Sequence, residues 1–491
     1  MGKWSKEQKE AARQLLARRK ARKNFWAFCQ YMDADFFIDK PAPEHIDLPG
    51  IWHRKYLKKC AAALQQVERG KIEMLMMNMP TRAGKTYIMS MWTAWMFGRH
   101  NKGSIMRNSY GASLYRDYSH DTMNIIQDPK YVELFPETKL ATSAVDGWRL
   151  ETGNRVSFFG AGVCGPLAGK GCTLAAISDD LIKDFQESQS PTILNTAWMW
   201  KRSVHNRRKE GNCPEIYMGT MWSRKDPASQ SIEVEGLLKD GGKWVRIKIA
   251  ALDENDQSFC ELVRTTEQYQ EMRRTEDSVI WEAVSQQNPI EVKGLLYPAE
   301  SLNYYKLSEV EKYSNLAYAE SWDSTICYID TADEGVDHLC STIGNIKGTM
   351  VFIGPDIVHT QEPIEITEGK VASQLVDNNP DRIIVESNNG GKPFARKLNT
   401  LIKGRCRASA RWIPNTQNKE TRMIMKTGKV KEHFWFLAPS EYQQGSNYDI
   451  FMRHLTSTLK TMPVGKNQKD DAADNITGLA EMVDKKGLQF G

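Results

Sequence analysis

Long apolar stretches are missing from this sequence. No segment approaches the roughly 18 consecutive apolar residues that mark a membrane-spanning helix, and the opening MGKWSKEQKE lacks the apolar core of a secretory signal. The nine cysteines are scattered and include no CxxC pair, which argues against zinc and against a disulfide framework. We therefore expect a protein with reduced thiols, in a cytoplasm, that does not work in a membrane.

A strong excess of charge of either sign is also missing. The chain has 66 Lys and Arg against 61 Asp and Glu, a net charge of +5, which permits a nucleic-acid partner but does not require one. The basic residues are concentrated at the start, where residues 3–23 include nine Lys or Arg. This segment is either a solvated basic helix or an arm that contacts phosphates or a partner subunit.

Short apolar segments alternate with helical patterns in two separate series, and 491 residues are enough for about two to four domains. Strands are expected at 71–80, 104–110, 155–160, 173–178, 215–220 and 244–252, and again at 326–330, 349–354, 357–366 and 382–387. Such alternation predicts an α/β fold with mostly parallel strands covered on both faces. The expected divisions are a basic helical region at 1–48, a first α/β domain at 49–252, a connecting subregion at 253–320 and a second α/β domain at 321–491.

The sharpest local motif is MPTRAGKT at 79–86, between an apolar strand and an apolar helix. A phosphate-binding loop needs backbone N–H groups at a helix start, a Lys that reaches the phosphates and a Ser or Thr hydroxyl for Mg2+. Gly84, Lys85 and Thr86 supply the end of that pattern, whereas Met79 stands where the first Gly is usual. The motif predicts an ATP-binding loop made of Pro80, Thr81, Arg82, Ala83, Gly84, Lys85 and Thr86.

A pair of carboxylates follows the apolar strand at 173–178. Asp179 would hold Mg2+ through water, and Asp180 would polarise the water that attacks ATP, a role usually taken by Glu. The alternative is an ordinary strand end at which an Asp caps the next helix.

Carboxylates also stand at the ends of predicted elements in the second series. Asp330 and Glu386 each end a strand, and Asp470, Asp471 and Asp474 open the last helix, with Asp471 and Asp474 on one helical face. Two-metal cleavage of a phosphodiester needs several carboxylates on rigid elements around a pair of Mg2+ or Mn2+ ions. The alternative is that each residue merely ends a strand or caps a helix. Asp333 and Asp337 are further carboxylates after the first strand.

Together these motifs resemble the large subunit of tailed-phage terminases. The loop at 80–86 is similar to that of the family in containing an Arg and in lacking the first Gly. Three further segments are similar: Gly169-Lys170-Gly171, Asp179-Asp180 with the following residues 181–184, and residues 218–226. The similarity extends from about residue 50 to about residue 480. It implies a P-loop ATPase of the ASCE type with a mostly parallel sheet, followed by a ribonuclease H-like α/β nuclease.

The resemblance also implies roles for single residues. Trp52 and His53 would help to frame the adenine. The family often has Arg where Lys170 stands, so the finger that stabilises the transition state would be Lys170, Arg82 or another Arg. Asp330, Glu386 and Asp471 would bind the nuclease metals, with Asp474 next in line and Asp470 able to replace Asp471.

A terminase would use ATP and Mg2+ to drive double-stranded viral DNA into a procapsid, and its nuclease would cut concatemeric DNA. The expected partners are DNA, a terminase small subunit, the portal of the procapsid and further copies of the chain in a ring, all in the host cytoplasm. One alternative is a helicase-like repair ATPase fused to a nuclease, which should carry a second motor-like domain. Another is a scaffold protein with an inactive ATPase, against which the intact Lys85 and Asp179 argue.

Overall fold

The computed structural model describes residues 5–167, 169–290, 294–309, 322–331, 338–387, 391–415, 418–461 and 469–484. The chain divides into two compact units: unit 1 is Met1–Met272 with Ser278–Glu291, and unit 2 is Arg273–Asp277 with Val292–Gly491. The two series of alternating elements expected from the sequence therefore fall into separate units, and the segment 253–320 is shared between them. Within the described residues, no helix is long and apolar enough to span a membrane.

Unit 1 is built on a six-stranded sheet in the order β5-β2-β6-β7-β1-β8, in which every neighbouring pair is parallel. Its strands are β1 (Met74–Asn78), β2 (Ile105–Asn108), β5 (Phe158–Phe159), β6 (Ala175–Asp179), β7 (Glu215–Met218) and β8 (Trp244–Lys248); β3 (Leu140–Thr142) and β4 (Arg149–Leu150) form a separate hairpin. Its helices are α1 (Lys6–Lys23), α2 (Phe25–Met32), α3 (Lys55–Glu68), α4 (Lys85–Arg99), α5 (Ala112–Gln127), α6 (Pro129–Leu134), α7 (Phe185–Ser188), α8 (Pro191–Trp200), α9 (Pro227–Glu235) and α11 (Ser278–Ile280), and α10 (Thr266–Thr275) crosses the division between the units.

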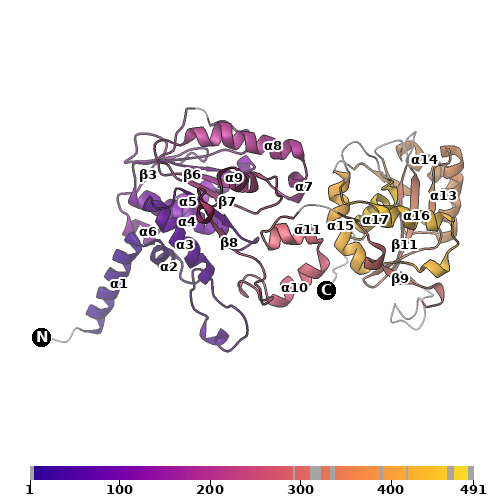
Figure 1. The fold of residues 1–491 in the computed structure, drawn as a ribbon, viewed down its shortest axis with the longest axis horizontal. Coiled ribbons are helices and arrows are strands. Elements are labelled where there is room, and N and C mark those ends of the chain that lie inside the picture. Colours follow the sequence, from indigo (N-terminus) through magenta and orange to yellow (C-terminus); the bar gives the residue numbers. More distant parts are fainter. Residues whose placement is uncertain are drawn as a thin grey trace. The chain divides into compact units, whose positions relative to one another are not determined.

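Alternate residues of β1 face two different apolar cores, which explains why this strand is apolar throughout. Leu75 and Met77 pack with side chains of α2, α3 and α4, whereas Met74 and Met76 pack with Trp200 and other side chains on the opposite face. In Figure 1, α3 and α4 lie on one side of this sheet and α8 lies on the other. A buried parallel sheet of this kind requires strands that are apolar on both faces.

The N-terminal basic helix leads directly into the unit 1 core. Ser5 and Gln8 form a capping box at the start of α1, and most of α1 is exposed. In α2, Phe25 and Phe28 are completely buried, and Phe25 packs 5.5 Å from the ring of Trp95 in α4. The structure therefore joins the end of the segment 1–48 to the first α/β unit.

Unit 2 contains a mixed sheet in the order β15-β14-β10-β11-β12-β16-β9, with β13 paired to β11. The strands are β9 (Asn303–Tyr305), β10 (Ser324–Asp330), β11 (Leu339–Lys347), β12 (Met350–Ile353), β13 (Val358–Thr360), β14 (Arg382–Glu386), β15 (Ala410–Ile413) and β16 (Phe434–Leu437). The helices are α13 (Ile364–Asn378), α14 (Gly391–Ile402), α15 (Lys419–His433), α16 (Asn447–Ser457) and α17 (Asp471–Asp484).

The centre of this sheet has the ribonuclease H-like arrangement that the sequence predicted. β10, β11 and β12 are antiparallel neighbours, and β14 and β15 follow in parallel beside β10. One face packs on α13 and α14 through a core that includes Ile329, Leu375 and Leu398. On the other face α17 crosses close to the central strands, because a Cβ on Gly478 would lie 2.2 Å from the ring of Tyr328.

One strand expectation was wrong in part. The segment 357–366 was expected to be a single strand, but β13 covers only Val358–Thr360, and Ile364 already begins α13. Pro363 lies between them with φ −54°. Proline has no N–H for a strand ladder and its fixed φ suits the start of a helix, which accounts for the change of structure at this point.

Candidate nucleotide-binding and nuclease sites

The predicted phosphate loop connects the end of β1 to the start of α4 in unit 1. Gly84 precedes the helix with φ 84°, and a Cβ there would lie 2.9 Å from the ring of Phe36, so glycine is required for two reasons. Arg82 also has a positive φ of 62° and its side chain is exposed. Tyr56 donates a hydrogen bond to the Ala83 carbonyl at 2.9 Å. The loop is therefore held in a conformation that few sequences adopt without support.

The side chain of Lys85 lies at the carboxyl edge of the sheet. Its ammonium donates to the Met79 carbonyl at 3.0 Å and to the Thr220 hydroxyl at 3.1 Å, and the residue is buried. The Thr220 N–H in turn donates to Asp180 Oδ1 at 3.0 Å. Lys85, Thr220 and Asp180 thus form a continuous chain of polar contacts across the ends of β1, β6 and β7.

Asp179 ends β6 and Asp180 follows it directly, with β7 between β6 and β1 in the sheet. Asp180 has a positive φ of 48°, and a Cβ on Gly219 would approach Asp180 Oδ1 to 2.7 Å. Positive φ at a non-glycine residue costs energy and is concentrated at functional sites. The strand end and the Gly219-Thr220 turn therefore fit each other closely.

Asp179 is completely buried and is held by a residue that the sequence analysis missed. Arg107 on β2, also fully buried, donates from Nε (2.9 Å) and Nη2 (2.5 Å) to Asp179 Oδ2, and from Nη1 to Ser90 Oγ in α4 at 2.9 Å. Burial raises the pKa of Asp179 to about 6, while the guanidinium of Arg107 opposes that rise. Arg107 could have been suspected from the sequence, because it is a charged residue inside the apolar segment 104–110.

One observation indicates that Asp179 and its neighbours fit a Mg2+-nucleotide. Asp179 Oδ1 is buried and makes no hydrogen bond within the described part of the chain, while Oδ2 is taken by Arg107. An unsatisfied buried carboxylate oxygen is costly unless a cation or water occupies its free side. Thr86 lies in the first turn of α4, directly after Lys85. Its carbonyl oxygen accepts a hydrogen bond from Arg107 Nη2 at 3.4 Å, so the start of α4 is connected to Asp179 through Arg107.

Other residues predicted for this site lie in different surroundings. Trp52 stacks on His45 at 4.4 Å and donates to the Pro49 carbonyl. His53 accepts a hydrogen bond from the N–H of Lys55 at 3.3 Å. The ammonium of Lys170 lies 3.5 Å from the Asp146 carbonyl oxygen. For these residues, the contacts described here are to neighbouring loops and not to residues 80–86.

In unit 2, the predicted carboxylates gather beside the ends of β10 and β14 and the start of α17. Burial raises the pKa of Asp330 well above its usual value, and the charges of Asp474, Glu386 and Asp471 add to this effect. The pKa of Glu386 is also raised, mainly by burial, and Tyr328 donates to Glu386 Oε2 at 2.6 Å. Elements distant in the sequence therefore bring these acids close enough to influence one another. Asp333 and Asp337 lie outside the described residues.

Two cations that the sequence analysis did not select lie among these acids. Lys419 donates to Asp470 Oδ1 at 2.8 Å and lies 3.3 Å from Asp474 Oδ2. Arg422, one turn later on α15 and almost fully buried, lies 3.1 Å from Asp474 Oδ1 and 3.7 Å from Glu386 Oε2. The spacing i,i+3 at the start of a helix places both on one face, but nothing in the sequence indicates what that face meets.

The three aspartates of 470–474 differ in their surroundings. Asp474 is 4% exposed and has the largest charge effect on Asp330. Asp471 is 6% exposed, and its Oδ2 accepts the N–H of His338 at 3.0 Å. Asp470 is more exposed and pairs with Lys419. Carboxylate oxygens are the donors that Mg2+ and Mn2+ prefer, but no three of these acids place oxygens within 4.8 Å of one another in the described residues.

No protein-family model matches this sequence, and no curated protein sequence matches it. Among solved structures, a large terminase from a thermophilic bacteriophage aligns at TM-score 0.50 with 10% identity, covering 86% of this chain and 98% of that one. The chain has the fold of a terminase large subunit.

Weaker matches carry the same description. The large terminase of bacteriophage HK97 aligns at TM-score 0.36 with 11% identity, covering 92% of this chain and 98% of that one. The manganese-bound nuclease domain of the large terminase subunit of bacterial virus Sf6 aligns at TM-score 0.27 with 11% identity over 37% of this chain and 94% of its own. At such identities a shared terminase fold establishes architecture and not activity.

Proposed function

We propose that this protein is a terminase large subunit, which hydrolyses ATP to move double-stranded DNA into a procapsid and cuts concatemeric DNA with a two-metal nuclease. One observation carries the proposal. The chain has the terminase fold and carries two groups of polar residues at strand ends. In unit 1 the loop at 80–86 and the pair Asp179-Asp180 follow strands of the parallel sheet, and in unit 2 a group of buried carboxylates lies at the ends of β10 and β14.

In the motor, the loop at 80–86 would bind the phosphates of ATP through the N–H groups at the start of α4. Lys85 would contact the β- and γ-phosphates. Thr86 and Asp179 would hold Mg2+, which when bound neutralises charge on the phosphates. Asp180 would orient the attacking water. Thr220 contacts both Lys85 and Asp180. Loss of the γ-phosphate would therefore change the contacts of Thr220 just after β7.

Two candidates could stabilise the charge of the transition state. Arg82 lies in the loop itself with an exposed side chain, which supports contact with nucleotide or with a neighbouring subunit. Lys170 would supply only a point charge, whereas a guanidinium can bind two phosphate oxygens at once. We therefore favour Arg82 over Lys170 as the finger.

In the nuclease, Asp330, Glu386, Asp471 and Asp474 would hold two divalent ions, with Asp470 at the edge of the site. When bound, such ions activate water and stabilise the leaving oxygen. The chain's own cations support this assignment, because Lys419 and Arg422 hold the acids in place. Unpaired, so many buried carboxylates would strongly destabilise the fold.

The proposed partners follow from the same function. Duplex DNA would be held mainly through its phosphates, so binding should tolerate sequence changes and weaken with salt. A small subunit, the portal of a procapsid and further copies of this chain in a ring would complete the machine in the host cytoplasm. The helicase alternative has less support, because the mixed sheet of unit 2 differs from the parallel sheet expected of a second motor domain.

ATP hydrolysis by the full chain, with and without duplex DNA, tests the proposed motor. We expect turnover that DNA stimulates and that Lys85→Ala reduces by more than about 100-fold, since phosphate contacts of this kind contribute several kcal/mol to the transition state. Lys102→Ala is the matched control, because Lys102 is exposed in the loop before β2. Turnover that is absent in the unmodified chain, or unchanged in Lys85→Ala, would refute the motor.

A further inference from the structure

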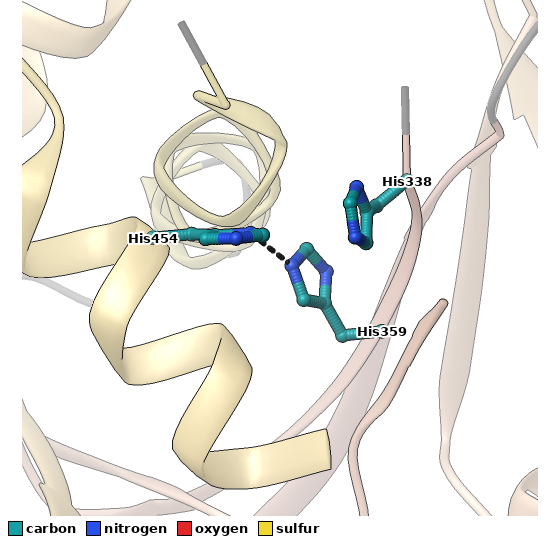
Figure 2. A group of neighbouring side chains, drawn as sticks. All are labelled: His338, His359 and His454. Atoms are coloured by element: carbon teal, nitrogen blue, oxygen red, sulfur yellow. Dashed lines mark hydrogen bonds between the residues drawn. The ribbon is translucent and has the colours of Figure 1, made fainter. Parts of the chain in front are cut away.

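Three of the nine histidines converge in unit 2. His338 precedes β11, His359 lies on β13 and His454 lies on α16. Each offers one ring nitrogen, and these three nitrogens lie within 4.8 Å of one another. Among the described residues, this is the only group of three or more His, Cys, Asp or Glu side chains with that property. Figure 2 shows the three rings side by side, with a hydrogen bond between His359 and His454; the His338 ring is stacked on that of His359 at 4.7 Å.

The strand register explains why the rings meet. Cys340 lies opposite His359 in the antiparallel pair of β11 and β13, so His338, two residues before Cys340, is on the same face as His359. On α16, Phe451 and His454 are one turn apart, and the Phe451 ring meets the edge of His359 at 5.9 Å. That packing brings the His454 ring against those of His338 and His359, with centroids 4.9 and 5.0 Å away.

The burial of the rings suits a metal. His338 and His359 are 7% and 1% exposed, and imidazole nitrogen in its neutral form is a common ligand of transition metals. His359 Nε2 lies 2.8 Å from His454 Nδ1, but His359 Nδ1 is buried and has no hydrogen-bond partner among the residues that the structure describes.

We propose that His338, His359 and His454 form a binding site for one Zn2+ ion, separate from the carboxylate site of the nuclease. Imidazole nitrogen suits Zn2+ and its transition-metal neighbours, whereas Mg2+ and Ca2+ prefer oxygen. Zinc at about 2.0–2.1 Å from each nitrogen needs ring nitrogens roughly 3.3 Å apart. To satisfy this requirement, the 2.8 Å contact between His359 and His454 would open by roughly 0.5 Å. The ring of His338, now stacked on that of His359, would turn its nitrogen toward the other two, and water would take the fourth position.

The proposed ion would have a structural consequence for the nuclease. It would tie the start of β11 to β13 and α16. The N–H of His338 holds Asp471 Oδ2 at 3.0 Å, and the same oxygen lies 3.8 Å from His338 Nδ1. At 3.8 Å the ring nitrogen makes no hydrogen bond to this carboxylate, so the contact with Asp471 runs through the backbone N–H of His338. The metal would therefore fix the position of Asp471, although zinc binding itself does not depend on nuclease activity.

Zinc titration of the chelator-treated full chain by calorimetry, in millimolar Mg2+, tests the proposal. We expect one equivalent of Zn2+ to bind even when Mg2+ saturates the carboxylates. Co2+ in place of Zn2+ should give the intense visible absorption of a four-coordinate site. Absence of Zn2+ binding in Mg2+, or Co2+ spectra of only six-coordinate type, would overturn the proposal without requiring any variant.

Three variants locate the ion. His454→Gln should weaken Zn2+ binding by more than about 100-fold, because it removes a ligand, and loss of a residue that only hydrogen-bonds to a ligand can already cost that much. Since His454 is partly exposed, the change should leave the fold intact. His120→Gln, at an exposed site on α5, should bind as the unmodified chain does, and so should Asp330→Asn. Loss of binding in Asp330→Asn with retention in His454→Gln would assign the ion to the carboxylates and refute the site. Circular dichroism of each metal-free variant separates loss of a ligand from loss of the fold.

Discussion

Arg107 illustrates how a single buried charge can organise a site. Its guanidinium contacts Asp179, Ser90 and the Thr86 carbonyl, and it stacks on the Tyr118 ring at 3.8 Å. One side chain thereby connects β2, β6 and α4. Because both Arg107 and Asp179 are fully buried, each is favourable only while the other is present.

Removing Arg107 alone should therefore be costly. We expect Arg107→Met to lower the free energy of unfolding by about 3–5 kcal/mol, since it leaves a buried carboxylate without its partner. Arg107→Met combined with Asp179→Asn should lose at least about 1 kcal/mol less than the sum of the two single changes. Urea unfolding followed by tryptophan fluorescence measures both quantities. Strict additivity would contradict the pairing, and Arg116→Met, which breaks the exposed pair with Asp146, should have little effect.

His205 gives unit 1 a pH dependence. It is fully buried between Asn108 and Ser178, and burial lowers its pKa to about 3. Between pH 6.5 and 3 the unfolded chain binds a proton that the folded chain does not, so stability decreases as the pH falls through this window.

We expect His205→Gln to make the unfolding free energy less dependent on pH between 6.5 and 4.5, by up to about 1.4 kcal/mol per pH unit. Unfolding curves at pH 4.5, 5.5 and 6.5 give this slope directly. His120→Gln, at an exposed position, should leave the slope unchanged. An identical slope for the unmodified chain and His205→Gln would show that His205 is protonated in the folded state.

Asp474 and Asp470 give a matched test within the nuclease. Asp474 is buried among Lys419, Arg422 and Asp330, whereas Asp470 is more exposed. We expect Asp474→Asn to reduce Mn2+-dependent cleavage of plasmid DNA by more than about 100-fold, and Asp470→Asn to reduce it by less than about 10-fold. If Asp470→Asn reduced cleavage more than Asp474→Asn, the metal ligand would be Asp470, just before α17, and not Asp474.

At the scale of elements, α17 approaches the sheet of unit 2 closely at one glycine. A Cβ on Gly478 would lie 2.2 Å from the Tyr328 ring, whose hydroxyl holds Glu386. Helical Gly→Ala changes usually stabilise by up to about 1 kcal/mol, but overpacking costs about 1–3 kcal/mol. Gly478→Ala should therefore destabilise unit 2 and weaken cleavage together.

The control lies in another helix of the same unit. Gly369 in α13 is exposed, with nothing within 4 Å of an added Cβ. Gly369→Ala should raise thermal stability slightly, whereas Gly478→Ala should lower it, as measured by differential scanning calorimetry. If both changes stabilised the protein, the described contact of α17 with Tyr328 would be wrong.

Elements that are apolar on both faces could be predicted from the sequence. β1, β6, β10 and β14 were expected within a few residues of their observed bounds, because continuous apolar runs mark buried strands. β11 was not expected, since its sequence LCSTIGNIK mixes small and polar residues, and its burial comes from two neighbouring strands. Lys419 and Arg422 were missed for the same reason, because tertiary packing and not local pattern gives them their neighbours, whereas Arg107 does have a local signal as a charge inside the apolar segment 104–110.

At the scale of the whole molecule, two units with different sheets each place acids at strand ends. The expected α/β class, with a parallel sheet first and a ribonuclease H-like sheet second, is confirmed. The order of the motifs along the chain was informative because each unit folds around its own core. The sequence could not show which aspartate of 470–474 lies deepest, because a helix start presents all of them nearby.

The most direct test of this account measures ATP hydrolysis and plasmid cleavage on the same preparations of the full chain, Lys85→Ala and Asp330→Asn. Each site lies at strand ends of a different unit. The account predicts that Lys85→Ala loses hydrolysis and retains Mn2+-dependent cleavage, whereas Asp330→Asn loses cleavage and retains hydrolysis. Loss of both activities in either correctly folded variant, or cleavage that survives Asp330→Asn, would contradict it.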